Sequence, residues 1–184
     1  MDNIIIAVSG KIGSGKSTVC DIISNHYANT KVLAFADDLK KFVSIISNLP
    51  LELMYTEEGK NTYVSSYNMT VGEMLQKIGT DALRTHFDTD IWVKSLFNKI
   101  QENDTILIPD LRFKNEAQYS RQKGAKLIRI NGDPLEHNKN SKRNTNHISE
   151  TDLDDWTDWD YIIDNNSSLK DLEHKVYDIL SKII

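Results

Sequence analysis

Five short apolar runs divide the chain, and segments with helical spacing lie between them. The runs cover residues 4–8, 31–36, 105–109, 126–130 and 161–164. Most of them lack strict alternation of apolar and polar residues, which is typical of strands buried on both faces of a parallel sheet. Strands that alternate with helices therefore predict an α/β fold with a parallel sheet.

Helical spacing of apolar residues is found in residues 16–27, 71–87, 91–100, 113–124 and 168–184. The last segment predicts a helix with one apolar face made of Leu169, Leu172, Val176, Ile179 and Leu180. Two segments, 49–70 and 131–150, fit no regular element. Loops of that length in a compact domain are usually lids or binding segments.

Composition narrows the class of protein. With 184 residues, 39% of them hydrophobic, the chain is long enough for one domain with a sizeable core and short for two, so we expect a single domain over residues 1–184. A net charge of −5 argues against nucleic-acid and anionic-membrane partners. The single cysteine, Cys20, excludes an internal disulfide and is expected in the core. The N-terminal apolar run is too short for a signal peptide or a membrane span, which predicts a cytoplasmic protein.

The stretch "SGKIGSGKST" at residues 9–18 carries the clearest chemistry. Gly10 to Ser17 fits G-x-x-x-x-G-K-[ST], with a predicted strand before it and a predicted helix after it. Backbone N–H groups of such a loop surround phosphate, Lys16 reaches the β- and γ-phosphates, and the Ser17 hydroxyl ligates Mg²⁺. A simple glycine-rich turn is disfavoured because strand, loop, Lys-Ser and helix all agree. The expected ATP-binding residues here are Gly13, Ser14, Gly15, Lys16, Ser17 and Thr18.

Carboxylates follow two of the predicted strands. Asp110 ends the third strand, where a carboxylate can act on Mg²⁺, and Arg112 two residues later can bind a substrate phosphate. The alternative is an Asp–Arg ion pair at the turn. Asp37 and Asp38 follow the second strand. They either orient the substrate or contact Mg²⁺-bound water, or they form a helix N-cap with acid in the first turn. Both interpretations stay open for Asp37, and capping is favoured for Asp38.

Further candidates lie on the helical and loop segments. Arg84 can clamp an acceptor phosphate or lie on a solvated helix face, and Trp92 can pack near a base or in the core. Asn165, in an Asn-Asn turn after the fifth strand, can contact adenine, and a serine after it can cap the last helix.

Loop 131–150 adds basic residues that either close over a triphosphate or form an exposed basic loop. They are Lys139, Lys142 and Arg143. Glu150 and His147 can hold a substrate group or one another. The chain has no guanine-reading N-K-x-D segment, which argues against a GTPase and favours a small-molecule kinase.

Taken together, several segments resemble those of the deoxynucleoside monophosphate kinases of tailed bacteriophages, in the same order along nearly the whole chain. They are "GKIGSGKST", "FADDLK", "LQKIGTDALR", "DIWV", "PDLRFKNE", "HISE" and "DNNSSLKDL". The resemblance implies a P-loop kinase fold similar to adenylate kinase, with a five-stranded parallel sheet in the order 2-3-1-4-5. It also implies a substrate-binding segment at about 37–100, a lid at about 131–150, and transfer of the ATP γ-phosphoryl to a deoxynucleoside monophosphate with Mg²⁺.

On this basis we expect Lys16, Arg112 and Arg143 to be catalytic, Ser17 and Asp110 to hold Mg²⁺, and Asn165 to complete the ATP site. The expected substrate-binding residues are Lys11, Asp37, Gln76, Arg84, Trp92, Asp110, Arg112 and Glu150. The family pattern often has proline where this chain has Asp38, and the chain is short between residues 49 and 70, so the resemblance does not predict which base is accepted. A homodimer is one candidate oligomeric state, and the host cytoplasm is the expected location if the source is viral.

Three alternatives remain open at the level of sequence. One is a kinase of another small phosphorylated acceptor, similar to phosphomevalonate kinase or dephospho-coenzyme-A kinase. The second is a non-catalytic ATP-binding switch, which the separate acceptor-side arginines disfavour. The third is a nucleic-acid 5′-kinase, which the net charge of −5 disfavours.

Overall fold

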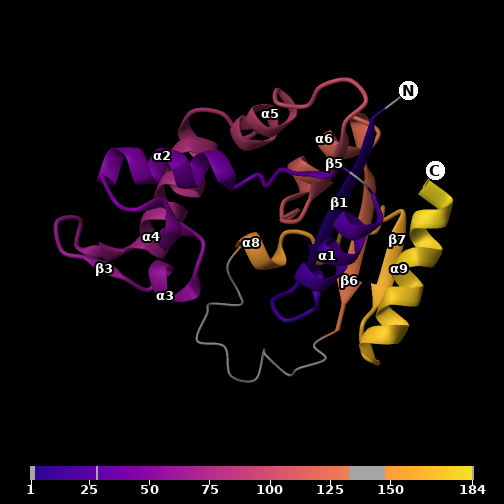
Figure 1. The fold of residues 1–184 in the computed structure, drawn as a ribbon. Coiled ribbons are helices and arrows are strands. Elements are labelled where there is room, and N and C mark those ends of the chain that lie inside the picture. The colour runs from indigo at the N-terminus through magenta and orange to yellow at the C-terminus, as the bar shows by residue number, and fades with distance from the viewer. Residues whose placement is uncertain (1–2, 28, 133–147, 184) are drawn as a thin grey trace. The chain divides into compact units, whose positions relative to one another are not determined.

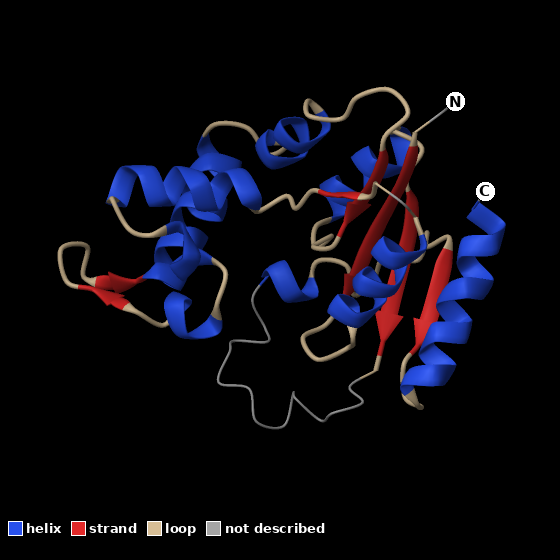
Figure 2. Ribbon diagram, viewed as in Figure 1, coloured by secondary structure: helices blue, strands red, loops and turns tan. Residues whose placement is uncertain are grey.

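The computed structural model describes residues 3–27, 29–132 and 148–183 (Figure 1). The chain forms two compact units. One consists of Met1–Ala34 with Ile100–Ile184, and the other of Phe35–Lys99. The first unit is built around a parallel sheet and the second is mainly helical, as the red strands and blue helices in Figure 2 show.

The sheet of the first unit has five strands, all paired in parallel. They are β1 (Ile4–Gly10), β2 (Lys31–Val32), β5 (Thr105–Ile108), β6 (Lys126–Asn131) and β7 (Tyr161–Asp164). Their order in the sheet is β2-β5-β1-β6-β7. The labels differ from the predicted 2-3-1-4-5 because a separate hairpin, which the sequence patterns missed, takes the labels β3 and β4. Counted along the five sheet strands alone, the predicted order holds.

The core of this unit fills one face of the sheet beneath two helices, α1 (Lys16–His26) and α9 (Leu169–Ile183) (Figure 1). The α9 helix buries Leu172, Val176, Ile179 and Leu180, whose spacing is that of one helix face. Leu169 was expected on that face but is 58% exposed, because it is the first residue of the helix. Helix α6 (Lys114–Gln122) connects β5 to β6 and packs against β6.

A serine cap begins α9, as the sequence predicts. The Ser168 hydroxyl accepts a hydrogen bond from the Asp171 N–H at 3.2 Å and lies 3.0 Å from the Asp171 carboxylate, to which it donates. This exchange satisfies one of the N–H groups that a helix start leaves without an intrahelical partner.

The two outer strands differ from the prediction of full burial. Strand β2 covers only residues 31 and 32 of the predicted 31–36, and both are exposed. In β7, Ile163 is 1% exposed but its neighbour Ile162 is 56% exposed. Each of these strands has a sheet neighbour on one side only, so part of its surface is left to solvent.

The second unit is an assembly of short elements. They are α2 (Asp37–Ser47), η1 (Leu51–Met54), α3 (Glu57–Lys60), β3 (Tyr63–Val64), β4 (Met69–Thr70), α4 (Val71–Gln76), the π-helical η2 (Lys77–Arg84) and α5 (Ile91–Phe97). The expectation that residues 49–70 lack regular structure is therefore wrong. The elements there are two to four residues long, which is too short for a hydrophobic period to show.

A small core holds the second unit together. Its buried members are Val43 from α2, Met54 from η1, and Val71 and Met74 from α4. Across the described residues of both units, no helix combines the length and apolar character that a membrane span requires.

The contrast between the central and outer strands generates a stability prediction. Ile6 on β1 is 0% exposed, so Ile6→Ala is expected to lower the free energy of unfolding by about 2–5 kcal/mol. Ile162→Ala removes the same atoms from an exposed position and is expected to cost less than about 1 kcal/mol. Urea unfolding followed by circular dichroism measures both, and equal losses would contradict the assigned core.

Candidate functional site

The phosphate loop joins β1 to α1 in the conformation that its glycines allow. Gly13 has φ 79° and Gly15 has φ 93°, both in the left-handed region that favours glycine. Gly15 is also the residue that precedes the first turn of α1. The loop therefore ends at a helix N-terminus, where unpaired N–H groups and the helix dipole favour an anion.

Lys16 lies inside this loop. Its Nζ donates to the backbone oxygens of Gly10 and Lys11, at 2.7 Å each. The pKa of Lys16 is lowered to about 8, mainly by burial and then by the positive charges of Arg112 and Arg129, while Glu150 opposes them. The environment of the ammonium is thus short of negative charge, and a bound anion would supply it.

Two arginines and two carboxylates surround the loop. The Arg112 guanidinium forms an ion pair with the Glu150 carboxylate and lies 3.4 Å from the Ser149 backbone oxygen. Arg129 Nη1 donates to Ser9 Oγ at 3.1 Å, and its Nη2 lies 3.7 Å from an Asp154 oxygen. The positive charges of Arg112 and Arg129 are therefore partly neutralised by Glu150 and Asp154.

Lys11 connects the phosphate loop to helix α8 (Ile148–Thr151). Its Nζ donates to the Glu150 backbone oxygen at 2.6 Å and pairs with Asp154 Oδ1 at 2.5 Å. The segment 148–154, which overlaps the end of the predicted lid at residues 148–150, is accordingly tied to the loop by Lys11 and by Arg112. Residues 148–151 are helical, whereas the sequence predicted an irregular segment there.

Asn165 supports the loop from the end of β7. It is 5% exposed, and its side-chain Nδ2 donates to the Ser14 backbone oxygen at 2.9 Å. A Cβ atom added to Gly15 would lie 2.3 Å from that same Nδ2. Gly15 is thus required both by its φ angle and by the close approach of Asn165, and the amide of Asn165 is already engaged with the loop backbone.

The two expected magnesium ligands follow β1 and β5 at the same edge of the sheet. Ser17 is exposed in the first turn of α1, and Asp110 is partly exposed two residues beyond β5. Burial raises the pKa of Cys20, one turn beyond Ser17, to about 12, and the charges of both Lys16 and Asp110 act on that thiol. Cys20 is therefore a core residue, as predicted, and Asp110 lies close enough to α1 to influence it.

The remaining expected residues lie in the second unit. Gln76 is exposed at the end of α4, and Arg84 ends η2 with its Nη1 3.5 Å from the Thr89 backbone oxygen. Asp37 accepts a hydrogen bond from the Tyr55 hydroxyl at 3.1 Å. Trp92 is 6% exposed, and its Nε1 donates to the Gly79 backbone oxygen at 3.1 Å.

The prediction that Asp38 is the N-cap residue is wrong, whereas the expectation of acidic residues in the first turn of that helix is confirmed. Ala36 is the N-cap residue of α2, and Asp37 and Asp38 both lie in the first helical turn. Asp38 instead forms an ion pair with Lys99 at 2.6 Å and accepts a hydrogen bond from the Ser95 hydroxyl. The expected lid residues Lys139, Lys142, Arg143 and His147 lie outside the residues that the structure describes.

Sequence reasoning missed two residues of this site, Arg129 and Asp154. An arginine within the otherwise apolar run "KLIRI" is the one signal that points to Arg129, since a charge inside a sheet strand needs partners. Asp154 lies in an acidic segment, "TDLDDWTDWD", whose individual carboxylates look alike in sequence.

The fold and the phosphate loop together define a P-loop kinase. Among solved structures, shikimate kinase from Bacteroides thetaiotaomicron has the same fold, with a TM-score of 0.55 at 13% identity over 98% of each chain. The family model for deoxynucleotide monophosphate kinase matches residues 51–176. The chain belongs to this family, and it is a phosphotransferase that acts on nucleoside monophosphates.

Two relatives support this assignment. A protein of Acanthamoeba polyphaga mimivirus that carries the same family name is 27% identical over 189 aligned residues, which cover 94% of each chain. The deoxynucleotide monophosphate kinase of Enterobacteria phage T4 is 30% identical over 116 residues, which cover 60% of this chain and 45% of the phage protein.

The position of Asn165 generates a prediction. Asn165→Ala is expected to lower the free energy of unfolding by about 1–3 kcal/mol, because the Ser14 oxygen loses a buried hydrogen bond. It should also weaken ATP binding, since the loop backbone loses its support. Chemical denaturation and the KM for ATP measure the two effects. Asn166→Ala, at the exposed neighbouring residue, is the matched control, and indistinguishable behaviour of the two variants would argue against the support role.

Proposed function

We propose that this protein transfers the γ-phosphoryl group of ATP to the phosphate of a deoxynucleoside monophosphate, and that the phosphate loop of the first unit holds the donor. The observation that carries this proposal is the partly buried ammonium of Lys16, with a pKa lowered to about 8 by burial and by the charges of Arg112 and Arg129. A triphosphate supplies the negative charge that this cluster lacks.

The reaction needs positioning more than acid–base chemistry. An acceptor phosphate is largely ionised near neutral pH, so its oxygen attacks the γ-phosphorus in line, the bond to the β-γ bridging oxygen breaks, and ADP leaves. Lys16 stabilises charge on the β- and γ-phosphates. Arg112, whose guanidinium binds the Glu150 carboxylate, has the geometry to bind a phosphate in the same manner. Arg143 of the proposed lid, residues 131–150, supplies a further cation.

The residues present fit a magnesium ion. Mg²⁺ in phosphoryl-transfer sites takes one or two protein ligands and completes its shell with phosphate oxygens and water. A hydroxyl from Ser17 and a carboxylate from Asp110 meet that requirement. When bound, the ion neutralises phosphate charge and fixes the orientation of the triphosphate.

The acceptor is proposed to bind the substrate-binding segment, at about residues 37–100, which nearly coincides with the second unit. Asp37, Gln76, Arg84 and Trp92 are its expected contacts there, and Lys11, Asp110, Arg112 and Glu150 those of the first unit. Asn165 supports the ATP site from the end of β7. The viral and phage sources of the relatives support a location in the host cytoplasm.

Removal of the loop lysine tests the donor site. Lys16→Ala is expected to lower kcat at least about a hundredfold, because the transferred charge loses its closest cation. The circular dichroism spectrum should stay that of the wild type. Lys182→Ala, on the exposed side of α9, is the control. Turnover near the wild-type rate in Lys16→Ala would refute the site assignment.

Arg84 tests the acceptor site separately. Arg84→Ala is expected to raise the KM for the deoxynucleoside monophosphate about tenfold or more, since a charge-assisted bidentate contact is lost, and to leave the KM for ATP within about twofold. Steady-state kinetics with each substrate varied in turn measure both constants. Arg121→Ala, which removes an arginine paired with Asp158 and Asp160, is the control. Equal weakening of ATP and acceptor would count against the assigned role.

A further inference from the structure

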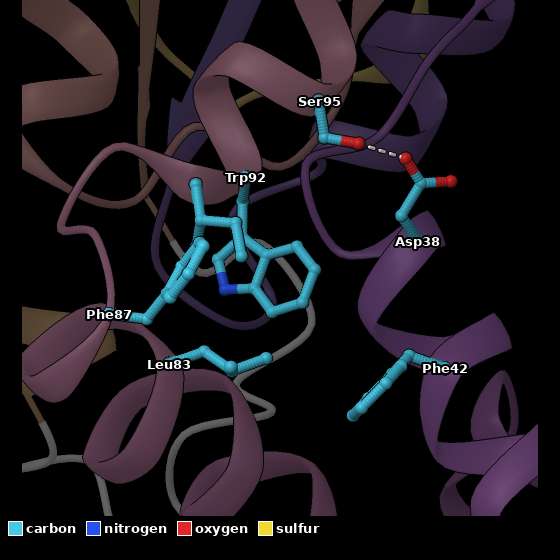
Figure 3. Close-up of a pocket in the computed structure, with 7 residues that line it drawn as sticks. Asp38, Phe42, Leu83, Phe87, Trp92 and Ser95 are labelled. Carbon is cyan, nitrogen blue, oxygen red and sulfur yellow. Dashed lines mark hydrogen bonds between the residues drawn. The ribbon is translucent and has the colours of Figure 1, made fainter.

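The second unit contains a pocket of about 370 Å³ with mostly apolar walls (Figure 3). Its walls come from α2, η2, α5 and the turn before α5, and they consist of Asp38, Phe42, Leu83, Phe87, Ile91, Trp92 and Ser95. Three of these side chains are aromatic. Apolar pockets of this size with a few polar groups are the usual form of small-molecule sites in proteins.

The aromatic walls limit what the pocket can hold. The buried indole of Trp92 is fixed by its hydrogen bond to the Gly79 oxygen, so a flat face is held in place. Phe42 and Phe87 are 43% and 76% exposed, so their rings remain accessible to a ligand. Flat aromatic ligands stack on such surfaces regardless of which polar groups they carry. Nucleobases are the flat ligands of this protein's family.

Among the described residues that line the pocket, Asp38 is the one charged group. Burial alone would raise the pKa of Asp38, but hydrogen bonds from Lys99 and Ser95 outweigh it and lower the pKa. In Figure 3 the carboxylate faces Ser95 across the upper part of the pocket. The Ser95 hydroxyl and the Lys99 ammonium both donate to Oδ2 of Asp38, whereas Oδ1 lies 3.7 Å from Lys41 Nζ. The carboxylate is therefore ionised and keeps capacity on Oδ1 to accept a hydrogen bond.

We propose that this pocket holds the base of the acceptor nucleotide and that Asp38 selects guanine. This inference rests on the proposed function. Guanine presents two adjacent donors, N1–H and the 2-amino group, which can converge on one carboxylate oxygen, Oδ1. In adenine and cytosine the amino group adjoins a ring nitrogen that repels the carboxylate, and in thymine the single N3–H lies between two carbonyl oxygens. Asp38 is thus a specificity-determining residue of the proposed acceptor site.

The test compares acceptors and variants in one assay. Initial rates of ADP release with Mg²⁺-ATP give kcat/KM for dGMP, dIMP, dAMP, dCMP and dTMP. The base of dIMP keeps N1–H but lacks the 2-amino group, so it isolates the contribution of that group. The variants are Asp38→Asn, which removes the charge, and Lys99→Gln, which removes the same ion pair but keeps the carboxylate.

The wild type is expected to prefer dGMP to dTMP by about tenfold or more, with dIMP between them, since a hydrogen bond to a charged group is worth that factor. Asp38→Asn should lower kcat/KM for dGMP about tenfold or more and leave dTMP within about threefold. Lys99→Gln should keep the wild-type order of acceptors. The kcat/KM of Asp38→Asn with dTMP therefore shows whether this variant is folded and active.

Three results would overturn the inference. The first is a wild type without a guanine preference. The second is a uniform loss for all acceptors in Asp38→Asn that Lys99→Gln reproduces, which would make Asp38 a structural residue. The third is an unchanged order of acceptors in Asp38→Asn. In these cases deoxynucleotides still stimulate ADP release and the proposed function stands, whereas no stimulation by any of them would refute both.

Discussion

The partly buried ammonium of Lys16 is the constraint on which the phosphate-binding unit depends. It lies within its own loop, where two backbone oxygens accept hydrogen bonds from it at 2.7 Å. The charges of Arg112 and Arg129 help to lower its pKa. Such a group costs free energy in the absence of an anion, because burial disfavours its charged form. The left-handed glycines, the helix N-terminus and the amide of Asn165 hold the backbone that encloses it. The negative charge of a bound triphosphate compensates the positive charge of this group. We therefore expect Lys16 to lower the stability of the ligand-free protein while it strengthens the binding of ATP.

The two units divide the chemistry by the kind of interaction that each provides. The parallel sheet and its covering helices give the first unit a large apolar core, on which a charged loop can be held rigidly. The second unit has a small core of four buried side chains and an apolar pocket with one carboxylate. Charge in the first unit suits phosphate, and aromatic surface in the second suits a base.

The sequence predicts the phosphate loop, the five sheet strands and the apolar face of α9, because each depends on local spacing alone. It does not predict the β3–β4 hairpin or the π-helical η2, since two-residue strands and a change of helical period leave no hydrophobic pattern. The partners of charged residues are also invisible to spacing. Arg112 pairs with Glu150, 38 positions away, and Asp38 with Lys99, 61 positions away, so tertiary structure alone decides that Asp38 is no helix cap.

In the proposed reaction, a phosphoryl group passes from ATP at the phosphate loop to a deoxynucleoside monophosphate. Incubation of the protein with Mg²⁺, γ-labelled ATP and a single deoxynucleoside monophosphate, followed by chromatography of the products, tests it most directly. The account predicts that the label appears in the deoxynucleoside diphosphate, with an equal amount of ADP. Bound ATP that remains intact with every deoxynucleotide, or ADP formed with the label in free phosphate, would contradict it.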